Sequence, residues 1–172
     1  MGKDIRKRKG VGTLLDKAFF EQIARDKAQT MYRVACGLLR HDADRQDAMQ
    51  NALLKAWEKR HTLRDEKLFT TWLIRILINE CRNIARAGQR VIPMETLPET
   101  PAPAYDMTAR DLVDRLPEKQ RLCVILHYLE GWPVKEVAQA LKVPQATVRG
   151  RLMQARKALK LELTKEEAAY ET

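Results

Sequence analysis

The chain has 172 residues, which suits one medium domain or two small ones, and its 45% of hydrophobic residues are enough to form a packed core. Its formal charge is +9. No apolar run approaches the roughly 20 residues of a membrane span, and the charged N-terminus lacks the apolar stretch of a signal peptide. Composition therefore excludes a membrane protein and predicts a cytoplasmic one.

Cysteine and histidine are too scattered to suggest a metal site. Cys36, Cys81 and Cys123 lie far apart without a CxxC spacing, and the three histidines are equally dispersed. We expect reduced, buried thiols and neither a metal nor another cofactor. Clustered carboxylates and a Gly-rich phosphate loop are also missing from the sequence, so we do not expect an enzyme.

The charge is unevenly distributed along the chain. Residues 1–90 carry an excess of nine positive charges and residues 108–172 an excess of three, whereas 91–107 contain three acids and no base. Two basic blocks around an acidic segment favour a polyanionic partner for the blocks and a different role for the middle.

A basic tail and the start of the first helix occupy residues 1–24. The helix is predicted from about Leu14 to Arg40, because apolar residues recur there at helical spacing. These residues are Phe19, Ile23, Met31, Val34, Ala35 and Leu38.

Two more helices are predicted before residue 90. Asp42 or Asp44 can cap the second helix, whose apolar stripe ends at Trp57. The polar stretch His61–Lys67 separates it from a third helix, which we expect to end at Gly88 in the manner of a C-cap.

Residues 91–107 differ from the rest of the chain because they contain four of the seven prolines, Pro93, Pro98, Pro101 and Pro103. Such a segment cannot be helical and is predicted to be a flexible, extended linker. A second helical domain follows at 108–162, and 163–172 form a C-terminal tail. The predicted fold class is therefore all-α, with two small helical domains, 25–90 and 108–162.

A helix-turn-helix is predicted at about 135–158. One apolar stripe is formed by Val134, Val137, Ala138 and Leu141. Lys142-Val143-Pro144 breaks this helix, and a second helix begins near Gln145. Seven bases and one acid lie between Lys135 and Lys160, and the outer face of the second helix is basic. This arrangement is typical of helices that read the major groove of DNA, although a helical hairpin with a solvated basic face has the same pattern.

The whole chain resembles the extracytoplasmic-function (ECF) group of the sigma-70 family of RNA polymerase sigma factors. Residues 116–160, which include TVRGRLMQAR, are similar to the family's region 4. Residues 44–57, DRQDAMQNALLKAW, and 69–86, FTTWLIRILINECRNIAR, resemble parts of region 2. Ala146, Gly150 and Gln154 depart from the usual Gly, Ser and Arg, so the resemblance predicts no particular promoter sequence.

The resemblance implies a promoter-recognising initiation factor with two polymerase contacts. Region 2 would bind the clamp helices of the largest subunit through Asp47, Gln50, Leu54 and Trp57, although an apolar-stripe Trp is more often a core residue. Region 4 would meet the flap of the second-largest subunit. An anti-sigma factor is a further expected partner, and no small-molecule substrate is expected.

The resemblance also implies two DNA sites. The −10 element would be bound by the polar break and the third helix, with Asn79 as a base reader and Trp72 either stacking on a base or lying in the core. The full −10 set is His61, Arg64, Trp72, Arg75, Asn79, Arg82 and Arg86. The −35 duplex would be read by the last helix, through Thr147, Arg149, Gly150, Arg151, Gln154, Arg156 and Lys157.

Gly150 has two interpretations. It costs about 1 kcal/mol of helix propensity relative to Ala, and its exposure suggests close approach of a DNA backbone or base. A tolerated surface glycine explains it equally well.

Two other classes of protein would also show a helix-turn-helix or a basic charge, namely operator-binding regulators and nucleases. An operator-binding regulator would not need the blocks at 44–57 and 69–86, and failure to capture core polymerase would identify it. A nuclease would need metal-dependent DNA cleavage, which a divalent-metal titration tests directly.

Replacing Arg149 by Ala is predicted to weaken −35 duplex binding by about 1–3 kcal/mol and to alter base preference. Binding assays on a set of variant duplexes check this. An unchanged affinity, or an equal loss on every sequence, would remove Arg149 as a base reader.

Overall fold

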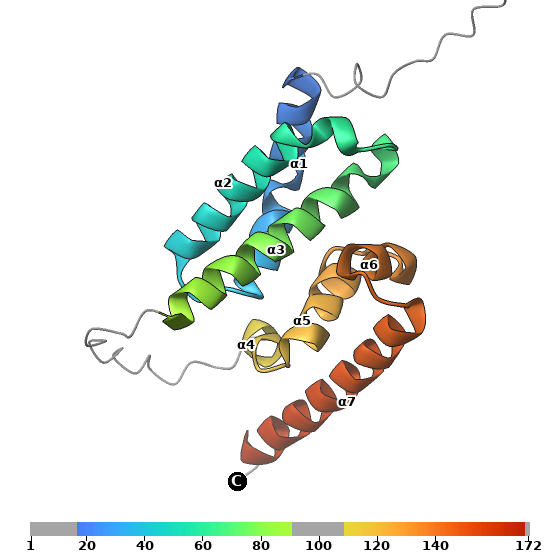
Figure 1. Ribbon diagram of the computed structural model, residues 1–172. Helices are drawn as coiled ribbons and strands as arrows, with labels where there is room; N and C mark the ends of the chain where they lie inside the picture. Colours follow the sequence, from blue (N-terminus) through green and yellow to red (C-terminus); the bar gives the residue numbers. More distant parts are fainter. Residues whose placement is uncertain (1–16, 91–108, 171–172) are drawn as a thin grey trace, which may run out of the picture.

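The computed structural model describes residues 17–90 and 109–170, and all of its regular elements are helical (Figure 1). This confirms the predicted all-α class. The first 16 residues, the predicted linker at 91–107 and the last two residues lie outside the described residues.

The N-terminal bundle consists of three helices. They are α1 (Lys17–Cys36), α2 (Asp42–Glu58) and α3 (Phe69–Arg90). Two short 3₁₀ turns, Arg60–Thr62 and Glu66–Leu68, occupy the polar break predicted between α2 and α3. The C-terminal bundle consists of α4 (Ala109–Asp114), α5 (Glu118–Val124), α6 (Val134–Leu141) and α7 (Gln145–Tyr170), with a π-helical turn at Ile125–Leu129.

The core of the N-terminal bundle is built on small residues of α2. Ala48, Ala52 and Ala56 recur every four residues and are fully buried, so the neighbouring helices can approach α2 closely. α3 supplies the large side chains, among them Phe69, which meets the ring of Phe20 at 5.7 Å.

Some details of the sequence prediction are wrong. The N-cap of α2 is His41, and Asp42 and Asp44 lie inside the first turn of the helix. Phe20 is buried and Phe19 is largely exposed, because position 20, eleven residues before Met31, lies on the same face of α1 as Met31. Gly88 does not end α3, which continues to Arg90. A glycine inside a helix costs only about 1 kcal/mol, which is too little to stop a helix whose earlier turns are held by buried residues.

The helix-turn-helix is formed by α6 and α7 as predicted. α6 is capped by Lys142, which adopts the left-handed conformation (φ 54°) and donates its N–H to the carbonyl of Ala138. Val137 of α6 and Val148 and Leu152 of α7 form the buried seam of the motif. α7 then runs to Tyr170 and includes residues 163–170, which we assigned to a tail.

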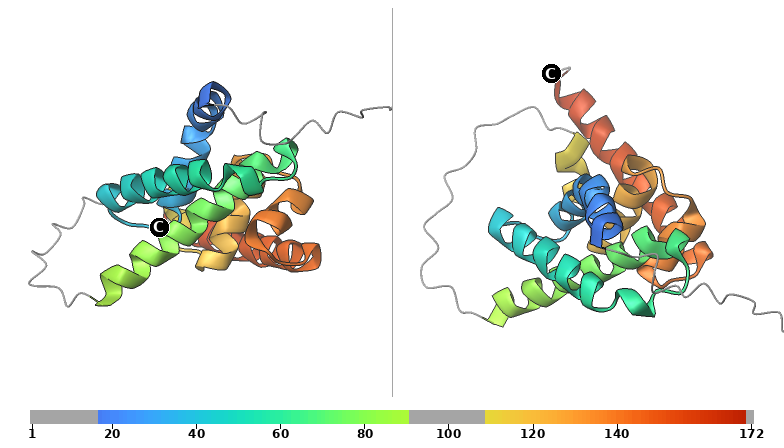
Figure 2. Two further views of the ribbon diagram at one scale, coloured as in Figure 1. Left: turned by 45° about the horizontal axis from the view of Figure 1, so that its top comes forward. Right: turned by 90° about the horizontal axis from the view of Figure 1, so that it is seen from above.

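The two bundles pack against each other. α3 contacts α6, and α1 contacts the π-helical turn. The turned views of Figure 2 show the C-terminal bundle (yellow to red) beside the N-terminal bundle (blue to green). Buried residues of both bundles join in one continuous hydrophobic cluster.

Leu77 and Leu54 offer a matched test of this core. Leu77 is fully buried in α3, whereas Leu54 on α2 is 62% exposed. We expect Leu77→Ala to lower the free energy of unfolding by about 2–5 kcal/mol, because it removes packed atoms and leaves a cavity. Leu54→Ala should change it by less than about 0.5 kcal/mol. Chemical denaturation followed by circular dichroism measures both, and equal effects would contradict the predicted core.

Candidate nucleic-acid interface

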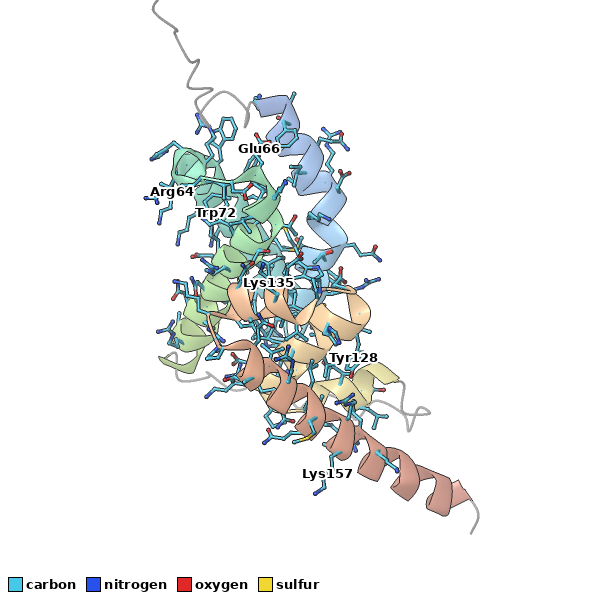
Figure 3. All side chains as sticks on the ribbon, turned by 90° about the vertical axis from the view of Figure 1, so that its right-hand side faces the viewer. Arg64, Glu66, Trp72, Tyr128, Lys135 and Lys157 are labelled. Carbon is cyan, nitrogen blue, oxygen red and sulfur yellow. The ribbon has the colours of Figure 1, made fainter. Side chains whose placement is uncertain are left out.

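One face of α7 is buried, and the basic residues of this helix lie outside that face. Val148, Leu152 and Ala155 turn into the core. Four candidate residues outside this stripe are exposed, namely Arg149, Gln154, Arg156 and Lys157. Figure 3 shows Lys157 projecting away from the body of the chain.

Three further −35 candidates, Thr147, Gly150 and Arg151, are half-buried. Thr147 lies in the first turn of α7, where helix amides without intrahelical partners can bind a phosphate. A Cβ at position 150 would meet no atom within 4 Å, so the fold itself does not require glycine there.

The polar side chains of this face have only weak partners. Arg149 donates to Gln145 at 3.4 Å, and Gln154 accepts from Gln120 at 3.3 Å, both at exposed positions. Such contacts are easily exchanged for contacts to bases or phosphates.

Grooves flank α7 on both sides. One, of about 440 Å³, lies between the π-helical turn and α7 and includes Tyr128, Arg149, Gly150 and Met153. The other joins residues 117–120 of the α5 start to Arg151 and Gln154. Sequence reasoning missed Tyr128 and Gln120, because their proximity to α7 depends on tertiary packing that no local period reveals.

The −10 candidates on α3 do not all face solvent. Asn79 and Arg86 are exposed, and Arg86 bonds its own helix at the carbonyl of Arg82. Arg75 instead donates to the carbonyl oxygen of Gln139 on α6 at 2.5 Å, and Arg82 donates to Glu118 at 3.0 and 3.1 Å. The C-terminal bundle therefore covers part of the face that the sequence predicts to meet DNA.

The other −10 candidates lie at the start of α3 and in the segment before it. His61 and Arg64 are exposed. Trp72 is half-buried against the core, with its ring 5.9 Å from that of Phe69. Figure 3 shows Arg64 and Trp72 at the same end of the N-terminal bundle.

The polymerase-binding candidates lie on α2. Asp47, Gln50 and Leu54 are exposed, and their spacing of three and four residues places them on one side of the helix. Trp57 is half-buried, 5.2 Å from the ring of Phe20, with the Arg60 guanidinium 3.9 Å from its centroid. We call the exposed residues Asp47, Gln50 and Leu54 the α2 edge.

Cysteine contributes no reactive group to this surface. Burial raises the pKa of the Cys81 thiol to about 12 and also raises that of Cys123, so both stay protonated at neutral pH. The three cysteines are free, as predicted, but Cys36 is only half-buried. Among the described residues no group of His, Cys, Asp and Glu could hold a metal ion. The described helices also include none long and apolar enough to span a bilayer.

Two sequence families match the chain. Residues 23–91 match Sigma-70 region 2, and residues 107–159 match Sigma-70, region 4. The RNA polymerase sigma-E factor of Streptomyces coelicolor is 31% identical over 151 residues, which cover 84% of this chain and 85% of the relative. The ECF RNA polymerase sigma factor SigM of Mycobacterium tuberculosis is 30% identical over 82% of this chain and 75% of its own length.

Solved structures share the fold. CnrH, in complex with the cytosolic domain of CnrY, aligns with a TM-score of 0.68 at 18% identity over 90% of this chain and 95% of CnrH. The sigma factor RpoE of Bartonella quintana, in complex with the anti-sigma factor NepR, aligns with a TM-score of 0.62 at 23% identity over 84% of this chain and 98% of RpoE.

The length of these matches and the order of the two regions agree with the helices and basic faces described above. The chain belongs to the ECF group of the sigma-70 family, whose members are non-catalytic initiation factors that bind core RNA polymerase and promoter DNA.

Proposed function

We propose that the chain directs core polymerase to promoters through three separate surfaces. The α2 edge binds the clamp helices of the largest subunit, with Trp57 supporting it from the core. The outer face of α7 reads the −35 duplex, and α3 with the segment before it binds the −10 strand. The C-terminal bundle also contacts the flap of the second-largest subunit.

The observation that carries this proposal is the one-sided exposure of α7. Because Val148, Leu152 and Ala155 are buried, Lys157 lies on the opposite side of the helix, and Arg149 and Arg156 are exposed at its flanks. A major groove admits one helix whose guanidinium groups bond guanine edges, while other cations hold phosphates. Arg149 and Gln154 are the proposed base readers, and Arg156 and Lys157 the proposed phosphate contacts.

We also propose an anti-sigma partner. The structural likeness to CnrH and RpoE, each solved with a bound protein, supports it. A groove of about 370 Å³ between α1 and the C-terminal bundle is mainly apolar and includes Tyr32, Ile125 and Leu129, which would suit an apolar helix face.

Transcription in vitro with core polymerase on a random promoter library tests the proposal as a whole. We expect defined start sites preceded by one upstream and one downstream sequence element. A chain that binds core polymerase but selects no start site would overturn it.

Leu54→Ala is expected to weaken binding to core polymerase by about 1–2 kcal/mol, because it removes apolar surface that the interface would take out of water. Fluorescence anisotropy without DNA measures the effect. Leu68→Ala is the matched control, because Leu68 is also an exposed leucine, at 42%, but lies in the 3₁₀ turn before α3, outside both proposed polymerase contacts. Equal affinity of the two variants would contradict the role of the α2 edge.

Gly150→Ala separates a DNA contact from a tolerated surface glycine. The substitution should raise the free energy of unfolding by up to about 1 kcal/mol, because alanine favours helix and position 150 has room for a Cβ. Affinity for the −35 duplex should nevertheless fall if a DNA strand approaches this position closely.

Gly88→Ala is the control for Gly150→Ala. Gly88 is also helical and also has no atom near its Cβ position, but it lies on α3. It should gain stability without changing −35 binding. If both variants bind the duplex like the wild type, Gly150 makes no close contact with DNA.

A further inference from the structure

Gln154, one of the two proposed base readers, has a side-chain amide whose two ends recognise opposite groups on a base. Its Oε1 atom accepts hydrogen bonds, and its Nε2 atom donates them. In the major groove, guanine O6 and thymine O4 are acceptors, whereas adenine N6 and cytosine N4 are donors. The base that Gln154 selects therefore depends on which end of its amide faces the DNA.

Gln120 on α5 favours one of these two orientations. Its Nε2 atom donates to the Oε1 atom of Gln154 at 3.3 Å. Accepting this bond directs the Oε1 end of the Gln154 amide towards α5 and the Nε2 end away from it. Gln120 is half-buried whereas Gln154 is exposed, so Gln120 has less freedom to change its rotamer and directs the amide of Gln154.

The packing of α5 against α7 keeps the two glutamines next to each other. The two helices are in contact, and Cys123 of α5 and Leu152 of α7 are buried. Arg151 also lies beside α5, because burial raises the pKa of the Cys123 thiol and the neighbouring Arg151 guanidinium partly offsets this rise. The contacts Gln120–Gln154 and Cys123–Arg151 run in opposite directions along the two helices, each with a step of three residues. This register is that of antiparallel helices whose facing residues lie on one side.

Both glutamines line one groove on the flank of α7. The groove has a volume of about 380 Å³ and also includes Lys119 and Arg151. Gln154 follows Gly150 by four residues and lies one turn further along the same side of the helix. A duplex that approaches this side of α7 therefore meets the Gln154 amide, while Gln120 lies behind it on α5.

We propose that Gln120 is a positioning residue that determines the base specificity of Gln154. With its Nε2 end outward, Gln154 donates to guanine O6 or thymine O4 of the −35 duplex. Adenine and cytosine are disfavoured, because their amino groups bring a second donor to the same place. The role of Gln120 rests on the proposed function of Gln154 as a base reader. One neutral hydrogen bond typically changes an equilibrium about fivefold, which sets the size of the expected preference.

Gln120→Glu tests the proposal, because a carboxylate can only accept hydrogen bonds. Gln154 then donates its Nε2 to the new carboxylate and turns its Oε1 end towards the DNA. Fluorescence anisotropy of the full chain is measured with labelled duplexes that carry the upstream element found by promoter selection, with each base pair changed in turn. Gln154→Ala identifies the base pair at which discrimination is lost. There the wild type should favour guanine or thymine about fivefold, and Gln120→Glu should favour adenine or cytosine by a similar factor.

Lys119→Gln is the matched control, because it makes the same change of net charge at the neighbouring exposed position and keeps both amides. It should weaken binding to every duplex by the same factor, since a lost positive charge reduces the attraction to phosphates of any sequence. Circular dichroism verifies folding. If Gln120→Glu does not fold, Gln120→Leu is the second variant, and without the hydrogen bond to Gln154 it should bring the affinities for the four bases closer together.

Combination with Gln154→Ala separates positioning from direct contact. In that background Gln120→Glu should leave the order of base preference unchanged, because the amide through which it acts is missing. An order that still changes would show that Gln120 contacts DNA itself and would overturn the proposal. An order that Gln120→Glu alone leaves unchanged, or a wild-type preference for adenine or cytosine, would also overturn it.

Gln154→Ala alone tests the underlying function. If it discriminates like the wild type at every base pair, Gln154 is not a base reader, and the positioning role of Gln120 fails with it. If Gln154→Ala loses discrimination while Gln120→Glu and Lys119→Gln behave alike, Gln154 remains a reader and only the role of Gln120 fails.

Discussion

Burial of one face of α3 is the constraint on which the rest of the structure depends. Phe69, Leu73, Leu77 and Cys81 recur every four residues, and all are buried. Because these four positions are fixed in the core, the helical period also fixes the directions of the other side chains of α3. The direction of the polar residues of α3, and therefore the surface available for a strand or for the second bundle, follows from the packing of apolar ones.

Buried residues also fix the orientation of α7, but more of its polar face remains exposed. Its buried seam against α6 is narrow, so a wide arc of the helix remains outside, and that arc carries most of its charge. On α3, part of the polar face is met by the other bundle. The two proposed DNA surfaces thus differ in availability although both arise from amphipathic helices, and this difference originates in tertiary contact rather than in the composition of either helix.

Local periodicity explains which features were predictable from the sequence. The break at Lys142–Pro144 and the helices around it depend on residues close in sequence, and the structure agrees with them. The sequence analysis places Phe19 instead of Phe20 on the apolar stripe of the first helix. Two adjacent aromatic residues fit a helical period almost equally well when the packing partner of the helix is unknown. The hydrogen bonds from Thr30 and Arg33 to Glu130 join residues about 100 positions apart, so no short window of sequence contains both sides. Whether Trp57 and Trp72 were core or contact residues likewise depended on packing.

The contact between the two bundles joins side chains of opposite charge, although both bundles are net positive. Both halves of the chain are net positive, so they repel each other at long range. At the contact itself, however, acids of the C-terminal bundle, Glu118 and Glu130, face Arg82 and Arg33 of the N-terminal bundle. These carboxylates offset the general repulsion over a short distance, and salt screens the largely buried Glu130 less than the exposed Glu118. A polyanion acts on both terms in the same direction, because its phosphates are attracted by the overall charge and also compete with the carboxylates for the arginines.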